Sequence, residues 1–186
     1  MWRWTKIINT LEGTFLRTIS ALAVDPAGIK VAAHGQLPIS VFPGSATNSF
    51  LFVLDTKTGA MVSKMIKIEY SSLFFTVRSS GMLLQNDGTI FMALDLAEPT
   101  GTTIPNMRLA SFDSVQGKMN YMMETAKSEL GHSAALAQSP DDLYLGGSYA
   151  ITNWHLAFIK ISNKDDPSTA KISTLAYKHT DCTSAF

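Results

Sequence analysis

The side chains in this sequence that could bind a metal ion or act as a general base are, first of all, its four histidines. They stand far apart in the chain, at His34, His132, His155 and His179. Their spacing matches neither the His-Glu-x-x-His signature nor any other pattern typical of a zinc site. We therefore interpret His34 and His155, which follow or lie within strand segments, as packing or rim residues, and we predict no metal site.

Two adjacent pairs of aspartates are a second group of potential ligands, because Ca²⁺ prefers oxygen ligands. The pairs are Asp141-Asp142 and Asp165-Asp166, and neither belongs to the twelve-residue pattern of an EF-hand loop. We interpret these carboxylates as solvated turn residues, and we predict that the chain holds no cofactor.

Motifs of nucleophilic catalysis and of phosphate binding are absent from the sequence. It contains no Gly-x-Ser-x-Gly elbow, no Gly-x-Gly-x-x-Gly fingerprint and no P-loop. A Ser/His/Asp triad has no fixed spacing, so a hydrolase that uses a central channel stays open as a third functional hypothesis. The sequence otherwise predicts that the chain is not an enzyme.

Charge restricts the class of partner. Lys plus Arg and Asp plus Glu each number 15, and charged residues make up 16% of the 186 residues. A nucleic-acid-binding protein normally carries a basic patch, so we exclude nucleic acid as a partner. A surface with so few charges favours contact with proteins and, as a second class, with glycans.

Three further features concern the membrane, the N-terminus and disulfides. No apolar stretch approaches the length of a membrane-spanning helix, which is about 20 residues. The first residues, Met1–Lys6, lack the apolar segment of a signal peptide. The single cysteine, Cys182, excludes an internal disulfide. We predict no membrane span, and these features leave the compartment unknown.

Repeated β-hairpins are the elements that must position all these residues. Three segments share one order: an apolar strand, a tight turn of Asp, Asn, Pro or Gly, and a second apolar strand. They span residues 21–35, 82–93 and 135–147, and a second hairpin follows each of them. Two hairpins make four strands, which is the size of one propeller blade.

We expect four strands in each of the three units. They span residues 19–24, 29–34, 50–55 and 60–66, then 82–85, 89–94, 108–112 and 117–122, and finally 134–137, 143–147, 156–161 and 170–176. Helical spacing is limited to residues 121–130, which allows at most one helical turn between the second and third units.

The first unit resembles the SBBP-type propeller repeat of secreted and surface proteins. The residues that carry the resemblance are Asp25, Gly28, Gly35, Phe50, Leu54, Asp55 and Gly59. The later units depart from this pattern at Leu94-Asp95 and at residues 163–166. The resemblance implies a scaffold without catalysis, and it favours an extracellular or cell-surface location.

We therefore predict an all-β fold, a partial β-propeller of about three four-stranded antiparallel blades with a leading strand. Residues 1–16 would form the closing strand of a preceding blade, and residues 17–70, 71–126 and 127–186 would form the three blades.

A closed propeller has four to eight blades, so three blades would leave two apolar blade faces uncovered. We expect these faces to contact the rest of a longer polypeptide, a second copy that closes a six-bladed ring, or other units of a larger array. The candidate interface residues are Trp2, Trp4, Ile7, Ile159, Ile161 and Leu175.

The predicted function is that of a structural or protein-interaction module in a larger assembly. The alternative is a lectin-like propeller that binds a sugar or another ligand. Its candidate stacking residues are Trp2, Trp4 and Trp154.

Overall fold

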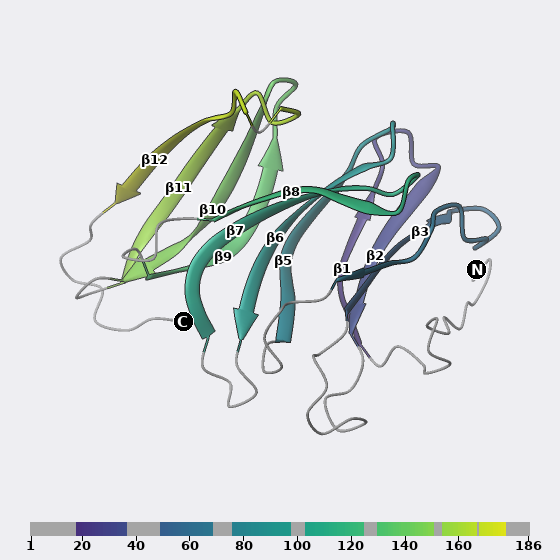
Figure 1. Ribbon diagram of the computed structural model, residues 1–186, viewed down its shortest axis with the longest axis horizontal. Helices are drawn as coiled ribbons and strands as arrows, with labels where there is room; N and C mark the ends of the chain where they lie inside the picture. The colour runs from purple at the N-terminus through teal and green to yellow at the C-terminus, as the bar shows by residue number, and fades with distance from the viewer. Residues whose placement is uncertain are drawn as a thin grey trace.

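The computed structural model of this chain describes residues 18–36, 49–68, 76–97, 103–124, 130–150, 154–166 and 168–177. Within these ranges the chain forms three antiparallel sheets and no helix. Figure 1 shows the three sheets side by side, in sequence order from the purple end to the yellow end of the molecule. The all-β class predicted from the sequence is therefore confirmed.

Each sheet has four strands, hydrogen-bonded in the order in which they occur along the chain. Sheet 1 contains β1 (Thr18–Val24), β2 (Lys30–Gln36), β3 (Ser49–Asp55) and β4 (Ile66–Ile68). Sheet 2 contains β5 (Thr76–Leu84), β6 (Thr89–Ala97), β7 (Thr103–Asp113) and β8 (Lys118–Glu124). Sheet 3 contains β9 (Leu130–Gln138), β10 (Asp142–Ala150), β11 (Trp154–Ser162) and β12 (Lys171–Tyr177). Each sheet falls within one of the three segments expected from the sequence, whereas residues 1–16 lie outside the described residues.

The largest difference from the expected strands concerns β4, which was expected at 60–66. The structure instead has a single bridge between Leu54 and Met61, followed by the short β4. The backbone N–H of Val53 donates to the side-chain Oγ of Ser63 at 2.7 Å. The hydroxyl of Ser63 thus replaces a backbone acceptor that a continuous strand would offer to β3. The hydrogen-bond ladder between the two strands is therefore interrupted.

The residues with helical spacing are strand as far as Glu124. β8 pairs with β7 through Ser111 with Tyr121 and Leu109 with Met123. The single helical turn that the spacing of residues 121–130 allowed is therefore not formed at 121–124, because pairing with β7 outweighs the local spacing. Residues 125–129 lie outside the described part.

The same turn closes the second hairpin in sheets 1 and 2. Oδ1 of Asp55 and Oδ1 of Asp113 each accept two backbone N–H groups of the following residues, at 2.8–2.9 Å. Each turn ends at a glycine with positive φ, 67° at Gly59 and 75° at Gly117. Only glycine adopts this backbone without strain, so the recurrence of Asp and Gly predicts the turn from the sequence.

The first strand of every sheet carries a β-bulge at the equivalent position. The register with the second strand skips Ser20 in β1, Ser80 in β5 and Ala134 in β9. A bulge adds one residue and increases the local twist. The three sheets therefore share this irregularity as well as their strand order.

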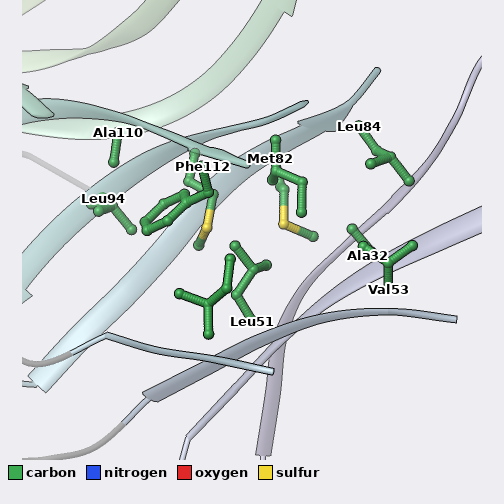
Figure 2. Close-up of a cluster of buried hydrophobic side chains, with 11 residues drawn as sticks. Ala32, Leu51, Val53, Met82, Leu84, Leu94, Ala110 and Phe112 are labelled. Atoms are coloured by element: carbon green, nitrogen blue, oxygen red, sulfur yellow. The ribbon is translucent and has the colours of Figure 1, made fainter. Parts of the chain in front are cut away.

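Two apolar cores lie between successive sheets. We call the face of a sheet that is directed toward the next sheet its trailing face, and the opposite face its leading face. The core between sheets 1 and 2 joins a trailing and a leading face through Ala32, Leu51, Val53, Ile66, Met82, Leu84, Ile90, Met92, Leu94, Ala110 and Phe112. Figure 2 shows Leu84 of sheet 2 lying beside Ala32 and Val53 of sheet 1. The core between sheets 2 and 3 is formed by Phe91, Ala93, Leu109, Leu143, Leu145, Ile159 and Ile161.

The first strands of the three sheets lie next to one another, β1 beside β5 and β5 beside β9. A Cβ placed on Gly81 of β5 would lie 2.8 Å from the backbone N of Leu136 in β9. Such close contact leaves no room for a Cβ at position 81 itself. On β1, Ala21 and Ala23 face sheet 2 and pack against the core shared with that sheet.

Candidate interaction surface

The leading face of sheet 1 carries an uncovered apolar stripe on β1. Leu22 is 64% exposed, and Ile19 and Val24 on the same strand are also exposed. Leu22 pairs with Ala33 of β2 as Met82 pairs with Met92 of β6, and each lies two residues after the β-bulge, so Leu22 and Met82 occupy equivalent positions in their sheets. Met82 is only 7% exposed, because sheet 1 covers it. No described residue covers the stripe on β1 in the same way.

The trailing face of sheet 3 is uncovered as well. Phe158 of β11 is 53% exposed, whereas Leu109, at the same position of sheet 2, is 1% exposed. Tyr144 of β10 is exposed, and its counterpart Phe91 in sheet 2 is fully buried. Large exposed apolar groups gathered on one face are typical of a surface that binds another protein.

The interface residues expected from the sequence fall in different places. Ile159 and Ile161 lie on the leading face of sheet 3, buried against sheet 2. Their side chains are therefore occupied within the chain, and the outward face of β11 is carried by Phe158 and Lys160 instead. Leu175 belongs to β12, where its backbone pairs with that of Phe158. The remaining three candidates, Trp2, Trp4 and Ile7, lie outside the described residues.

His34 is the histidine whose side chain the structure describes, and it is fully buried on the trailing face of sheet 1. Its Nδ1 lies 2.6 Å from Oγ of Ser20, the bulged residue of β1. Its Nε2 has no hydrogen-bond partner among the described residues. Burial lowers the pKa of His34 to about 4, so the imidazole is neutral at pH 7.

Within the described residues, this Ser20–His34 pair has no third group of a Ser/His/Asp triad. In a Ser/His/Asp triad one imidazole nitrogen bonds the serine and the other donates to a carboxylate. Here Nε2 faces no carboxylate within the described part of the chain. The pair can orient the imidazole in the core, but it lacks the group that would stabilise an imidazolium.

Other buried polar side chains line the same sheet interface. Oγ of Ser49 on β3 is buried without a partner in the described ranges. Nε of the buried Arg108 on β7 pairs with Oε2 of Glu124 at 3.1 Å. Sequence reasoning missed Ser20, Ser49 and Arg108, because they occupy places in strands whose neighbours are apolar and no motif marks them.

A polar hollow of about 390 Å³ lies between sheets 2 and 3. Its lining consists of Asp87, Thr89, Ser111, Asn120, Tyr121 and Asp165. Most of these groups bond to one another or to the backbone: Asn120 Nδ2 donates to Ser111 Oγ at 3.3 Å, and the Tyr121 hydroxyl donates to the carbonyl oxygen of Lys164. Burial, aided by the charge of Asp165, raises the pKa of Tyr121 to about 12.

The aspartate pairs considered as cation ligands lie in or next to turns. Asp142 Oδ2 pairs with Lys160 Nζ at 2.9 Å, and this hydrogen bond lowers the pKa of Asp142. Asp166 Oδ1 accepts from the hydroxyl and the backbone N–H of Ser168, which lowers the pKa of Asp166. Across the described ranges, no three His, Cys, Asp or Glu side chains gather closely enough to hold a metal ion.

No family model matches this chain, and no curated protein matches it. The described ranges also contain no helix that is long and apolar enough to cross a membrane.

Proposed function

We propose that this chain is part of a β-propeller and acts as a protein-interaction module in a larger assembly. Three copies of a four-stranded antiparallel unit, with first strands adjacent, support the propeller arrangement. Three units are fewer than the four to eight of a closed ring. The module would bind its partners through the exposed apolar stripe of β1 and the exposed trailing face of sheet 3.

One observation carries this proposal: a repeat position that is buried in sheet 2 is exposed in sheet 1. Leu22 and Met82 have similar apolar side chains in the same strand of the same unit, and they differ in having a sheet packed over them. A large apolar side chain that is exposed at a position buried in the neighbouring sheet is typical of a binding surface. Near-zero net charge removes the long-range repulsion that would oppose association.

A photocrosslinking amino acid placed at Leu22 tests the proposal in the cells that make the protein. We expect crosslinks to another protein chain from position 22, because the β1 stripe lies within an interface. The control is position 57, where Lys57 is exposed in the turn after β3 and should give no crosslink. Absence of any crosslink from position 22 would refute the proposed function.

A second candidate function, a lectin-like propeller, is favoured by the polar hollow that includes Tyr121. Aromatic rings next to hydroxyl and amide groups are suited to sugars, but the hydroxyl of Tyr121 already donates to Lys164. Ligand-observed NMR with a panel of monosaccharides tests this function. Binding that is lost in Asn120→Ala would support the lectin over the interaction module as the role of this hollow.

A further inference from the structure

We propose that the polar hollow between sheets 2 and 3 binds an arginine side chain of a partner protein. None of the residues that line this hollow belongs to β1 or to the trailing face of sheet 3, so the site is separate from the apolar surfaces described above. The inference rests on the proposed function for the kind of partner, which is a protein. It goes beyond that function by specifying the chemical group that the partner presents.

The hollow is lined by two acidic side chains that come from different sheets. Asp87 lies in the turn between β5 and β6, and Asp165 lies in the turn between β11 and β12. Both are exposed, and no described lysine, arginine or histidine is part of the lining. The volume of about 390 Å³ falls at the lower end of the range of ligand pockets, about 300–1,000 Å³. The charge of the lining therefore favours a positively charged ligand.

The hydrogen-bond donors of the lining are largely engaged within the protein. The hydroxyl of Thr89 donates to Oδ2 of Asp87 at 3.1 Å. The amide of Asn120 donates through Nδ2 to Oγ of Ser111 at 3.3 Å. The hydroxyl of Tyr121 donates to a backbone carbonyl oxygen in the turn after β11. The lining therefore offers a ligand mainly acceptors, which are carboxylate, hydroxyl and amide oxygens.

A guanidinium group matches such a set of acceptors. It carries five N–H donors, a positive charge and no acceptor. Its planar fork can bond one carboxylate through two N–H groups, while its other donors bond further oxygens. A sugar hydroxyl both donates and accepts, so a lining of acceptors suits it less well. Arginine is also enriched at protein interfaces, and we therefore assign the group to a partner protein.

The negative charge of Asp165 acts inside the hollow. Burial is the main cause that raises the pKa of Tyr121 to about 12, and the charge of Asp165 is the second cause. The ammonium group of Lys164 offsets part of this charge, since its Nζ lies 3.6 Å from Oδ2 of Asp165 and donates to the carbonyl oxygen of Pro140 at 2.6 Å. Asp87 adds a second carboxylate, so a guanidinium group in the hollow would be attracted by both acidic side chains.

Titration of the purified chain with a short peptide, followed by NMR, tests the site. The probe is acetyl-Gly-Arg-Gly-amide, and the control peptide carries citrulline in place of arginine, which has nearly the same shape and no charge. We expect the arginine peptide to shift the signals of the Asn120 side-chain amide and of the backbone amides of Thr89 and Asp165. The citrulline peptide should shift them far less, because it lacks the charge and adds an acceptor.

Two variants with the same change of charge make the test specific. The side chain of Asp165 is 78% exposed, so Asp165→Asn is expected to fold. It should weaken binding of the arginine peptide by about 2–5-fold, which is the effect of one exposed ion pair. The matched control is Asp141→Asn, at an exposed residue outside the hollow, and it should leave the affinity unchanged.

Three results would overturn the arginine site. They are equal binding of the two peptides, equal affinity of Asp165→Asn and the unchanged chain, and no shift at about 10 mM peptide, ten times a Kd of about 1 mM. Shifts caused by a monosaccharide and not by the arginine peptide would assign the hollow to the lectin function instead. If position 22 crosslinks in cells and the arginine peptide does not bind, the interaction module stands and only the arginine site is wrong.

Discussion

The first strands of sheets 1 and 2 follow the same pattern and differ in what covers them. Leu22 in β1 is 64% exposed and Met82 in β5 is 7% exposed, although both pair in the same register with the second strand of their sheet. The strand itself therefore does not decide whether this position is buried. The neighbouring sheet does, and sheet 1 lacks one on its leading face among the described residues.

Replacing the two residues by alanine gives the largest expected contrast. Met82→Ala should lower the free energy of unfolding by about 2–5 kcal/mol, because it leaves a cavity between sheets 1 and 2. Leu22→Ala should change the stability of a single copy by no more than about 0.5 kcal/mol. Urea unfolding at high dilution, where copies are separate, measures both. If both variants lost the same free energy of unfolding, β1 would be covered in the single chain, and the difference between the two strands would not exist.

The buried histidine of sheet 1 gives a second contrast, since its equivalent in sheet 2 is Ala93. The pKa of His34 is about 4 in the folded chain and 6.5 in the unfolded chain. As the pH falls, His34 therefore binds a proton at a higher pH in the unfolded chain than in the folded chain. The contribution of His34 to the free energy of unfolding is fully present above about pH 6.5. It is lost as the pH falls from 6.5 to 4, and the total loss is about 3 kcal/mol.

His34→Ala introduces the residue that sheet 2 has at this position, and it should flatten the pH dependence of unfolding between pH 6.5 and 4. The acidic groups are the same in both proteins, so the difference between the two curves isolates the imidazole. Parallel curves for the variant and the unchanged chain would mean that His34 is protonated, or exposed, in the folded state.

Two glycines, one between sheets and one on an exposed face, give the same comparison with a smaller expected effect. Gly81→Ala would place a methyl group 2.8 Å from the backbone N of Leu136, and we expect it to cost about 1–3 kcal/mol. Gly146→Ala, on the uncovered face of sheet 3, meets nothing closer than a ring atom of Phe158 at 3.8 Å. It should be tolerated within about 0.5 kcal/mol in a single copy. Thermal unfolding of both variants checks this order, and a reversed order would contradict the close approach of β5 and β9.

The strands were predictable from the sequence because turn chemistry marks their ends. Asp55 and Gly59 form the same turn as Asp113 and Gly117, and both the residues and the geometry recur. The position of β4 was not predictable, because the side chain of Ser63 replaces a backbone partner of the ladder.

The covered and uncovered faces could not be read from the strands either. Ile159 and Phe158 are neighbours in one apolar strand, and either could have faced outward. The structure places Ile159 against sheet 2 and leaves Phe158 exposed. Alternation within a strand separates two faces, but only the packing of sheets on one another tells which face is free.

Sedimentation equilibrium of the purified chain tests most directly whether it associates through the exposed faces of β1 and of sheet 3. We expect a mass above the 20.2 kDa of a single chain at pH 7, because the exposed apolar residues of β1 and of sheet 3 favour association. Leu22→Asp, which places a charge on the β1 stripe, should reduce it to the mass of one chain without unfolding it. A mass of 20.2 kDa for the unchanged chain at every loading concentration would contradict association through these faces.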